Sequence, residues 1–131
     1  MDPQQELFST LMTTLKTNYD VYDGALPALD VPYPFIYMGA SRLLDDYGNK
    51  TQVLGTVYQT IDVWHNDTTK RGTLSALLLA VKQAARNIDY TTNFAWRIKN
   101  ITQNILTDST TTTPLLHGVL DLEFGFSERK K

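Results

Sequence analysis

The sequence predicts an α+β fold in which two helices pack on one face of a four-stranded antiparallel sheet. Two segments repeat apolar residues at helical spacing, and four others alternate apolar and polar residues as half-buried strands do. The order is helix, strand, strand, helix, strand, strand. Two helices on one face of an antiparallel sheet would cover all these apolar faces at once. We expect residues 1–131 to form a single domain.

The first helix is predicted to begin at Asp2 and Pro3, because aspartate can cap a helix and proline suits its first position. The helix should fade near Asn18. Its apolar stripe consists of Leu7, Phe8, Leu11, Met12 and Leu15. Residues 19–34 contain Gly24 and three prolines, which predicts an irregular connection.

A short strand is predicted over Phe35–Met38, closed by Gly39. The polar residues 40–52 have the composition of a loop. Residues 53–65 form the next strand, with two faces of different character. Val57, Ile61 and Val63 share one face, and Tyr58, Thr60, Asp62 and Trp64 share the other.

The second helix has the clearest pattern in the chain. Residues 66–69 offer several capping side chains, and Lys82 and Arg86 complement the helix dipole near the C-terminal end. The apolar positions keep helical phase over four turns: Leu74, Leu77, Leu78, Val81, Ala85 and Ile88.

The last two strands flank a threonine-rich loop over residues 107–114. In the first strand the apolar parity changes after Ile98, which predicts a bulge near Lys99 or Asn100. The final strand has one hydrated face and ends in a frayed basic tail at residues 128–131. That face carries His117, Val119, Asp121 and Glu123.

Composition narrows the function classes. The chain has 12 basic and 14 acidic residues, a net charge of −2, which argues against binding by broad phosphate neutralisation. The absence of cysteine excludes disulfides, thiolate metal sites and a cysteine nucleophile, and fits a cytosolic origin. No stretch approaches the roughly 20 apolar residues of a membrane span, and the start of the chain lacks a signal-peptide pattern, so no membrane partner is expected.

The search for a catalytic centre finds no phosphate-binding, dinucleotide-binding, zinc-protease or serine-hydrolase motif. His65 and His117 lie on different predicted strands. Asp62 has the opposite strand parity to His65, so the two should not converge on a metal. We therefore expect no metal, no cofactor and no enzymatic activity.

Two charged pairs have alternative interpretations. Asp45 and Asp46 are either part of a solvated loop or an acid–base pair. A catalytic pair requires burial or a close like charge, because one of these is needed to shift the pKa of a carboxyl group. Lys70 and Arg71 oppose the dipole at the start of the second helix. They are either an ordinary exposed pair or a contact with a partner.

The polar faces of the strands also have two interpretations. Tyr58 and Trp64 either pack against a loop or form a contact between subunits, because aromatic residues are enriched at interface centres. Asp121 and Glu123 form either a solvated face or a functional acidic surface.

Three segments resemble a known family. They are the run Tyr33–Gly39 (YPFIYMG), the strand 57–66 (VYQTIDVWHN) and the helix opening Lys70–Thr73 (KRGT). This pattern resembles the tail-terminator proteins of long-tailed, non-contractile bacteriophages, also called tail-completion or head-to-tail joining proteins, in particular those of phages with Gram-positive hosts. The similarity covers less than half of the chain, while the length and element order of the whole chain agree with the family.

The resemblance implies a structural role in the virion and neither catalysis nor a cofactor. Such proteins form a sixfold ring that caps the head-proximal end of the tail tube, stops its growth and presents a surface to the head connector. The implied partners are other copies of this chain, the major tail tube protein and a head-completion protein. The protein would be made in the host cytoplasm, and DNA would pass through the lumen without specific binding.

On this interpretation the loops 40–52 and 107–114 are the protruding pieces that carry contacts, including Thr110, Thr111, Thr112 and Thr113. Asp121 and Glu123 are candidates for the lumen, where a neutral to acidic lining would not hold DNA. The alternatives are a head-completion protein, or a binding module or small enzyme of an unrelated α+β family.

Overall fold

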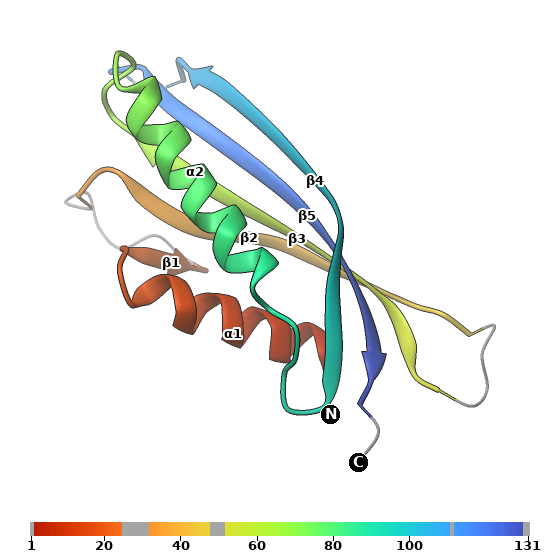
Figure 1. The fold of residues 1–131 in the computed structure, drawn as a ribbon. Helices are drawn as coiled ribbons and strands as arrows, with labels where there is room; N and C mark the ends of the chain where they lie inside the picture. The colour runs from red at the N-terminus through yellow and green to blue at the C-terminus, as the bar shows by residue number, and fades with distance from the viewer. Residues whose placement is uncertain (1, 25–31, 48–51, 111, 130–131) are drawn as a thin grey trace.

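The computed structural model describes residues 2–24, 32–47, 52–110 and 112–129. Its five strands form one sheet in the order β1-β2-β3-β5-β4 (Figure 1). The elements follow one another as α1 (Pro3–Lys16), β1 (Val21–Asp23), β2 (Phe35–Asp45), β3 (Leu54–His65), α2 (Arg71–Arg86), β4 (Phe94–Asp108) and β5 (Leu115–Glu128).

The sheet confirms the α+β class and corrects the prediction of four antiparallel strands. A fifth strand, β1, lies within the segment predicted to be irregular and pairs in parallel with β2, Val21 opposite Ile36. The other three pairings are antiparallel. A strand of three residues is too short to show alternation, and the burial of Val21 at 6% exposure depends on packing that the sequence does not display.

The prediction that residues 40–52 form a loop is wrong for residues 40–45, which continue β2. A register shift between Met38 and Ser41 marks a bulge, so Gly39 interrupts the strand and does not end it. A β-carbon at Gly39 would lie 2.9 Å from Asp62 Oδ2, which explains the glycine. The side chain of Gln59, 1% exposed, donates to the Gly39 carbonyl at 3.2 Å and satisfies the bulge. Residues 48–51 of the predicted loop lie outside the described residues.

The strands β4 and β5 confirm the predicted bulge, with a register shift between Ile98 and Asn100. The predicted loop 107–114 is shorter than expected, because Thr107 and Asp108 still pair with β5. The change of parity in the sequence was a reliable sign of the bulge, whereas polar composition did not separate the end of an exposed edge strand from a loop.

The helix starts differ in how they are capped. Asp2 caps α1 as predicted, accepting from the backbone N–H groups of Gln4 at 3.0 Å and Gln5 at 3.3 Å. The predicted side-chain cap for α2 is wrong: Lys70 occupies the N-cap position and its side chain makes no capping bond. Asp67 instead accepts from the backbone N–H and hydroxyl of Thr69, which fixes the preceding turn.

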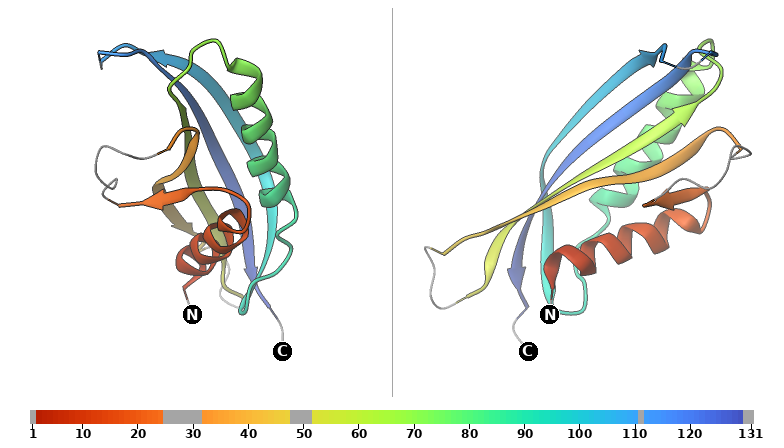
Figure 2. Two further views of the ribbon diagram at one scale, coloured as in Figure 1. Left: turned by 90° about the vertical axis from the view of Figure 1, so that its left-hand side faces the viewer. Right: turned by 180° about the vertical axis from the view of Figure 1, so that it is seen from behind.

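Both helices cover the same face of the sheet, and in the described part of the chain the opposite face carries no helix (Figure 2). Figure 2 (right) shows the sheet in front, seen from its helix-free side. The core lies between the layers. It contains the whole predicted stripe of the second helix and Leu7, Leu11 and Leu15 of the first, whereas Phe8 and Met12 are only partly buried against it. Among the described residues, neither helix combines the length and the apolar character that crossing a membrane requires.

The Glu6 carboxylate joins α1 to the connection between α2 and β4 through a group of hydrogen bonds that we call the Glu6 latch. Glu6 accepts hydrogen bonds from the Thr91 hydroxyl at 2.6 Å, the Asn93 backbone N–H at 3.0 Å and the Asn93 side-chain amide at 2.7 Å. The indole N–H of Trp96 donates to the same Thr91 hydroxyl at 2.9 Å. The latch ties the first helix to a connection more than 80 residues later in the chain.

Candidate functional site

The candidate site is the helix-free face of the sheet, which we call the open face. It is defined by the outward residues of the two central strands: Tyr58, Thr60, Asp62 and Trp64 on β3, and His117, Val119, Asp121 and Glu123 on β5. Because β3 and β5 are adjacent and antiparallel, residues of matching parity stand side by side across them. The sequence predicted these two sets separately, and the register brings them together.

One row of side chains across the open face, which we call a rung, joins four strands through polar and cationic contacts. The Arg42 guanidinium on β2 lies 4.0 Å from the centre of the Tyr58 ring. Tyr58 stands opposite Glu123, and the Asn100 amide on β4 donates to Glu123 Oε2 at 2.5 Å. The Asn100 hydrogen bond, with a smaller contribution from Tyr58, lowers the pKa of Glu123. Glu123 therefore keeps its negative charge to lower pH than an ordinary glutamate.

The neighbouring rung holds a second acid. The Thr60 hydroxyl donates to Asp121 Oδ1 at 2.8 Å, directly across the β3–β5 pair. Together with the previous rung it borders a shallow depression of about 380 Å³. Asp121 is exposed and Glu123 is half-buried, so this part of the open face presents hydrated carboxylates.

The third cluster joins His117 to Asp62 and Trp64, a contact that the sequence analysis did not predict. His117 Nε2 lies 2.7 Å from Asp62 Oδ1, and both side chains are mostly buried, 19% and 17% exposed. The imidazole stacks on the Trp64 indole, with ring centres 3.7 Å apart and planes 8° apart. The contact depends on the register of Trp64 opposite His117. Trp64 thus packs against a side chain of the neighbouring strand, and neither it nor Tyr58 is shown against a loop.

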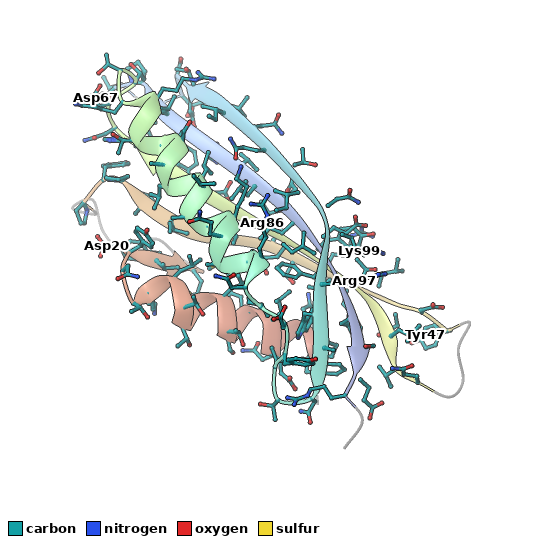
Figure 3. All side chains as sticks on the ribbon, viewed as in Figure 1. Asp20, Tyr47, Asp67, Arg86, Arg97 and Lys99 are labelled. Carbon is teal, nitrogen blue, oxygen red and sulfur yellow. The ribbon has the colours of Figure 1, made fainter. Side chains whose placement is uncertain are left out.

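A groove that the sequence analysis missed lies at the other end of the open face, and both the cations Arg97 and Lys99 and the acids Asp45 and Asp46 line it. Arg97 and Lys99 on β4 lie over Gly125, where a β-carbon would be 3.1 Å from Lys99 Cδ and 3.4 Å from Arg97 Nε (Figure 3). Lys99 Nζ reaches across to donate to Thr56 Oγ1 at 3.2 Å. The groove, about 700 Å³, also borders Tyr47, which is 87% exposed. The sequence did carry a signal for this groove. Gly125 lies between two phenylalanines of the last strand, and cations alternate with apolar residues on the strand before it.

The remaining predicted residues lie at the two ends of the sheet. Asp45 ends β2 and Asp46 follows it, at the end of the molecule where β2 turns towards β3. Lys70 and Arg71 begin α2 at the opposite end, where the β4–β5 connection with Thr110, Thr112 and Thr113 also lies (Figures 1 and 2). Thr111 lies outside the described residues. The structure therefore separates these candidates into two groups.

The end that carries Lys70 has two turns of the same design. Asp67 accepts from Thr69, and Asp108 accepts from the backbone N–H of Thr110 at 2.9 Å and its hydroxyl at 2.7 Å. These hydrogen bonds lower the pKa of both aspartates. The part of the chain that the structure describes holds no group of three or more potential ligands that could bind a metal.

Comparison with known proteins gives a likeness of fold. Neither a protein family nor a curated protein matches the sequence. Among solved structures, a chain of the virion of a native gene transfer agent particle superposes with a TM-score of 0.60 at 16% sequence identity. The superposition covers 98% of this chain and 95% of that one, so the two share a fold over almost their full lengths. Another solved chain, also 16% identical, reaches a TM-score of only 0.45, which is too low to indicate a common fold.

Proposed function

We propose that this protein is a structural component of a virion, a tail terminator that forms a ring on the head-proximal end of a tail tube. The observation that carries the proposal is the near-complete superposition on a chain that is itself part of a virion. The motifs at residues 33–39, 57–66 and 70–73, which resemble tail terminators, support it independently. In this role the chain works by contacting other virion proteins through its surfaces, without catalysis or a cofactor.

The open face suits the lumen of such a ring. Asp121 and Glu123 present carboxylates that are held by hydrogen bonds to Thr60 and Asn100 and face solvent. Fixed negative charge repels phosphates, so DNA would pass without being retained. The low pKa of Glu123 keeps this charge in place below neutral pH.

The two ends of the sheet suit the two faces of the ring. One end carries Asp45 and Asp46, and the other carries Lys70, Arg71 and the threonine-rich connection. In our proposal one of these ends contacts the last layer of tail tube subunits and the other contacts the head connector. Charged and polar groups at such ends would set partner choice and register.

The test is to block synthesis of this protein in cells that otherwise assemble the virions encoded by the same genome. The products are then imaged by electron microscopy. We expect tails of uncontrolled length that are not joined to heads, and restoration by a plasmid copy. Tails of normal length that fail to join heads would favour the head-completion alternative. Normal particles in the absence of the protein would contradict a structural role.

A further inference from the structure

The outer edge of β4 is covered at its start and open beyond its bulge. At the start, the Trp96 backbone N–H donates to the Asp89 carbonyl at 2.8 Å. The Thr91 backbone N–H donates to the Phe94 carbonyl at 2.9 Å, so the preceding connection occupies this part of the edge. From residue 100 to residue 107, β4 pairs only with β5 among the described residues, and it forms the border of the sheet (Figure 1). The outward backbone groups of this open stretch therefore have no described strand beside them.

The open stretch, residues 100–107, lacks the residues that protect edge strands. Its sequence is NITQNILT, with no charged residue, proline or glycine. Folded proteins normally place such residues on long exposed edges, because an unprotected edge pairs with another chain. Arg97 and Lys99 do not protect it, since they precede the stretch and extend over Gly125 of β5. The open stretch is therefore a candidate contact surface that works through its backbone.

The direction of each backbone group on this stretch follows from the direction of the side chain. In a strand the N–H and C=O of one residue point to the same neighbour, and residues whose side chains share a face share that direction. Phe94 and Trp96 are buried in the core and direct backbone groups outwards. Ile101 and Ile105 pack against the same core, so beyond the bulge they have the same orientation. Gln103 lies between them in the alternation, and its backbone groups also point outwards.

The open stretch is complementary to a second copy of itself. An antiparallel pair centred on Gln103 places this residue opposite its own copy, and Ile101 opposite Ile105 on either side. All of these positions have outward backbone groups, so the two strands satisfy each other's N–H and C=O. The isoleucine pairs extend the apolar layer between sheet and helices, while Thr102 faces Asn104 on the open face. A register centred on Asn104 would place Gln103 opposite Ile105 and lose the apolar pairs.

We propose that two copies of this chain pair antiparallel through residues 100–107 of β4, with a two-fold axis at Gln103, and join their sheets into one continuous sheet. Like charges do not meet in this register, since the paired stretch is uncharged and the two Lys99 residues lie at its opposite ends. The contact is the same on both copies and uses each edge once, so it gives a dimer and not a ring. The inference goes beyond the proposed function and does not depend on it.

Cysteine cross-linking of the full chain tests the two-fold axis. The sequence contains no cysteine, so a single introduced cysteine can form a disulfide only with another copy. Gln103→Cys should give a covalent dimer on mild oxidation, because Cα atoms of a hydrogen-bonded antiparallel pair lie about 5.5 Å apart, within the reach of a disulfide. Thr107→Cys is the matched control on the same exposed edge. Its two copies would lie at opposite ends of the paired stretch, so it should stay monomeric on non-reducing gels.

Two charge variants test the same axis without a covalent bond. Sedimentation velocity over a concentration series should show the parent passing from monomer to dimer. Gln103→Lys and Gln103→Glu should each lose the dimer at concentrations where the parent forms it, because like charges would face each other at the axis. Their equimolar mixture should regain it, since lysine then faces glutamate. Recovery in the mixture also shows that both variants are folded.

Three outcomes would overturn the proposal. Equal cross-linking of Gln103→Cys and Thr107→Cys would exclude an axis at residue 103. Charge variants that associate like the parent, or a mixture no better than its components, would show that residue 103 does not meet its own copy. A parent that stays monomeric at every concentration would show that the open stretch does not pair. The proposed function would still be decided by particle morphology in cells that lack the protein.

Discussion

The side chain of Leu78 on α2 occupies the space that a β-carbon at Gly118 on β5 would need. Such an atom would lie 2.9 Å from Leu78 Cδ1 and 3.0 Å from Cδ2. Leu78 is fully buried, so it has little room to move aside. Gly118 therefore sets how closely the second helix approaches the sheet, and the two residues form one packing unit.

We predict that Leu78→Ala lowers the free energy of unfolding by about 2–5 kcal/mol, the usual cost of a buried leucine truncation. Gly118→Ala should lower it by about 1–3 kcal/mol, because the added methyl group overpacks a filled core. The double variant should lose less than the sum, since the new methyl group fills part of the cavity. Urea unfolding of the four proteins measures these values.

Leu79→Ala is the control for this cycle, because Leu79 is the next residue on α2 and is 46% exposed. Its cost should stay within about 0.5 kcal/mol. Equal costs for Leu78→Ala and Leu79→Ala would show that the phase of the helix is misassigned. Strict additivity in the double variant would show that Leu78 and Gly118 do not share a packing site.

The Glu6 latch predicts a specific dependence of stability on pH. Partial burial by itself would raise the pKa of Glu6, but the hydrogen bonds from Thr91 and Asn93 outweigh it and lower the pKa. A carboxyl group with a lowered pKa in the folded state stabilises the protein above its unfolded pKa, near 4.5 here, and loses that contribution as the pH falls through its folded pKa. The latch should therefore be strong at neutral pH and weak in acid.

Glu6→Gln should accordingly be less stable than the parent at neutral pH, and the difference should shrink as the pH falls below about 4.5. Urea unfolding of both proteins across this range gives the difference directly, and it separates Glu6 from other carboxylates that titrate in the same region. A difference that stays constant down to low pH would mean that the latch does not depend on the charge of Glu6.

The His117 cluster predicts graded losses for two substitutions. His117→Ala removes both the stack on Trp64 and the bond to Asp62, and should lower the free energy of unfolding by about 2 kcal/mol. His117→Phe keeps an aromatic ring on Trp64 and loses only the bond, so its cost should be about half as large. Chemical denaturation measures both. Equal losses for the two variants would show that the stack contributes nothing measurable.

The sequence predicted the parts of the fold that have long, regular patterns. Four turns of apolar phase identified α2, and a change of parity located the bulge near Lys99. It failed where the pattern is short or interrupted: β1 has three residues, and the bulge after Met38 made the rest of β2 resemble a loop. In both cases the strand is defined by its hydrogen-bonded partner, which a single-sequence pattern does not include.

The site shows the same division. The sequence placed Asp62 and Trp64 on the polar face of one strand and His117 on the polar face of a later strand. Both assignments are correct, and the two polar faces belong to the same side of the sheet. Their contact follows from the register of β3 against β5, which depends on the packing of the whole sheet. Arg97 and Lys99 alternate with apolar residues, so in the sequence alone they resemble the ordinary solvated side of a half-buried strand. The interface roles of Tyr58, Lys70 and Thr110 stay predictions.

The connection between β4 and β5 supplies the last prediction, which concerns assembly. Its described residues are exposed and, apart from Pro114, polar, and the turn at Asp108 and Thr110 supports its first half. Because closure entropy changes slowly with loop length, replacing residues 110–113 by a two-residue turn should leave the thermal midpoint close to that of the parent. The same change should prevent completion of tails, leaving unjoined heads and tails or overlong tubes in electron micrographs. Unfolding of the shortened protein would assign the connection to the core, and normal particles would show that neither ring closure nor tube capping uses it.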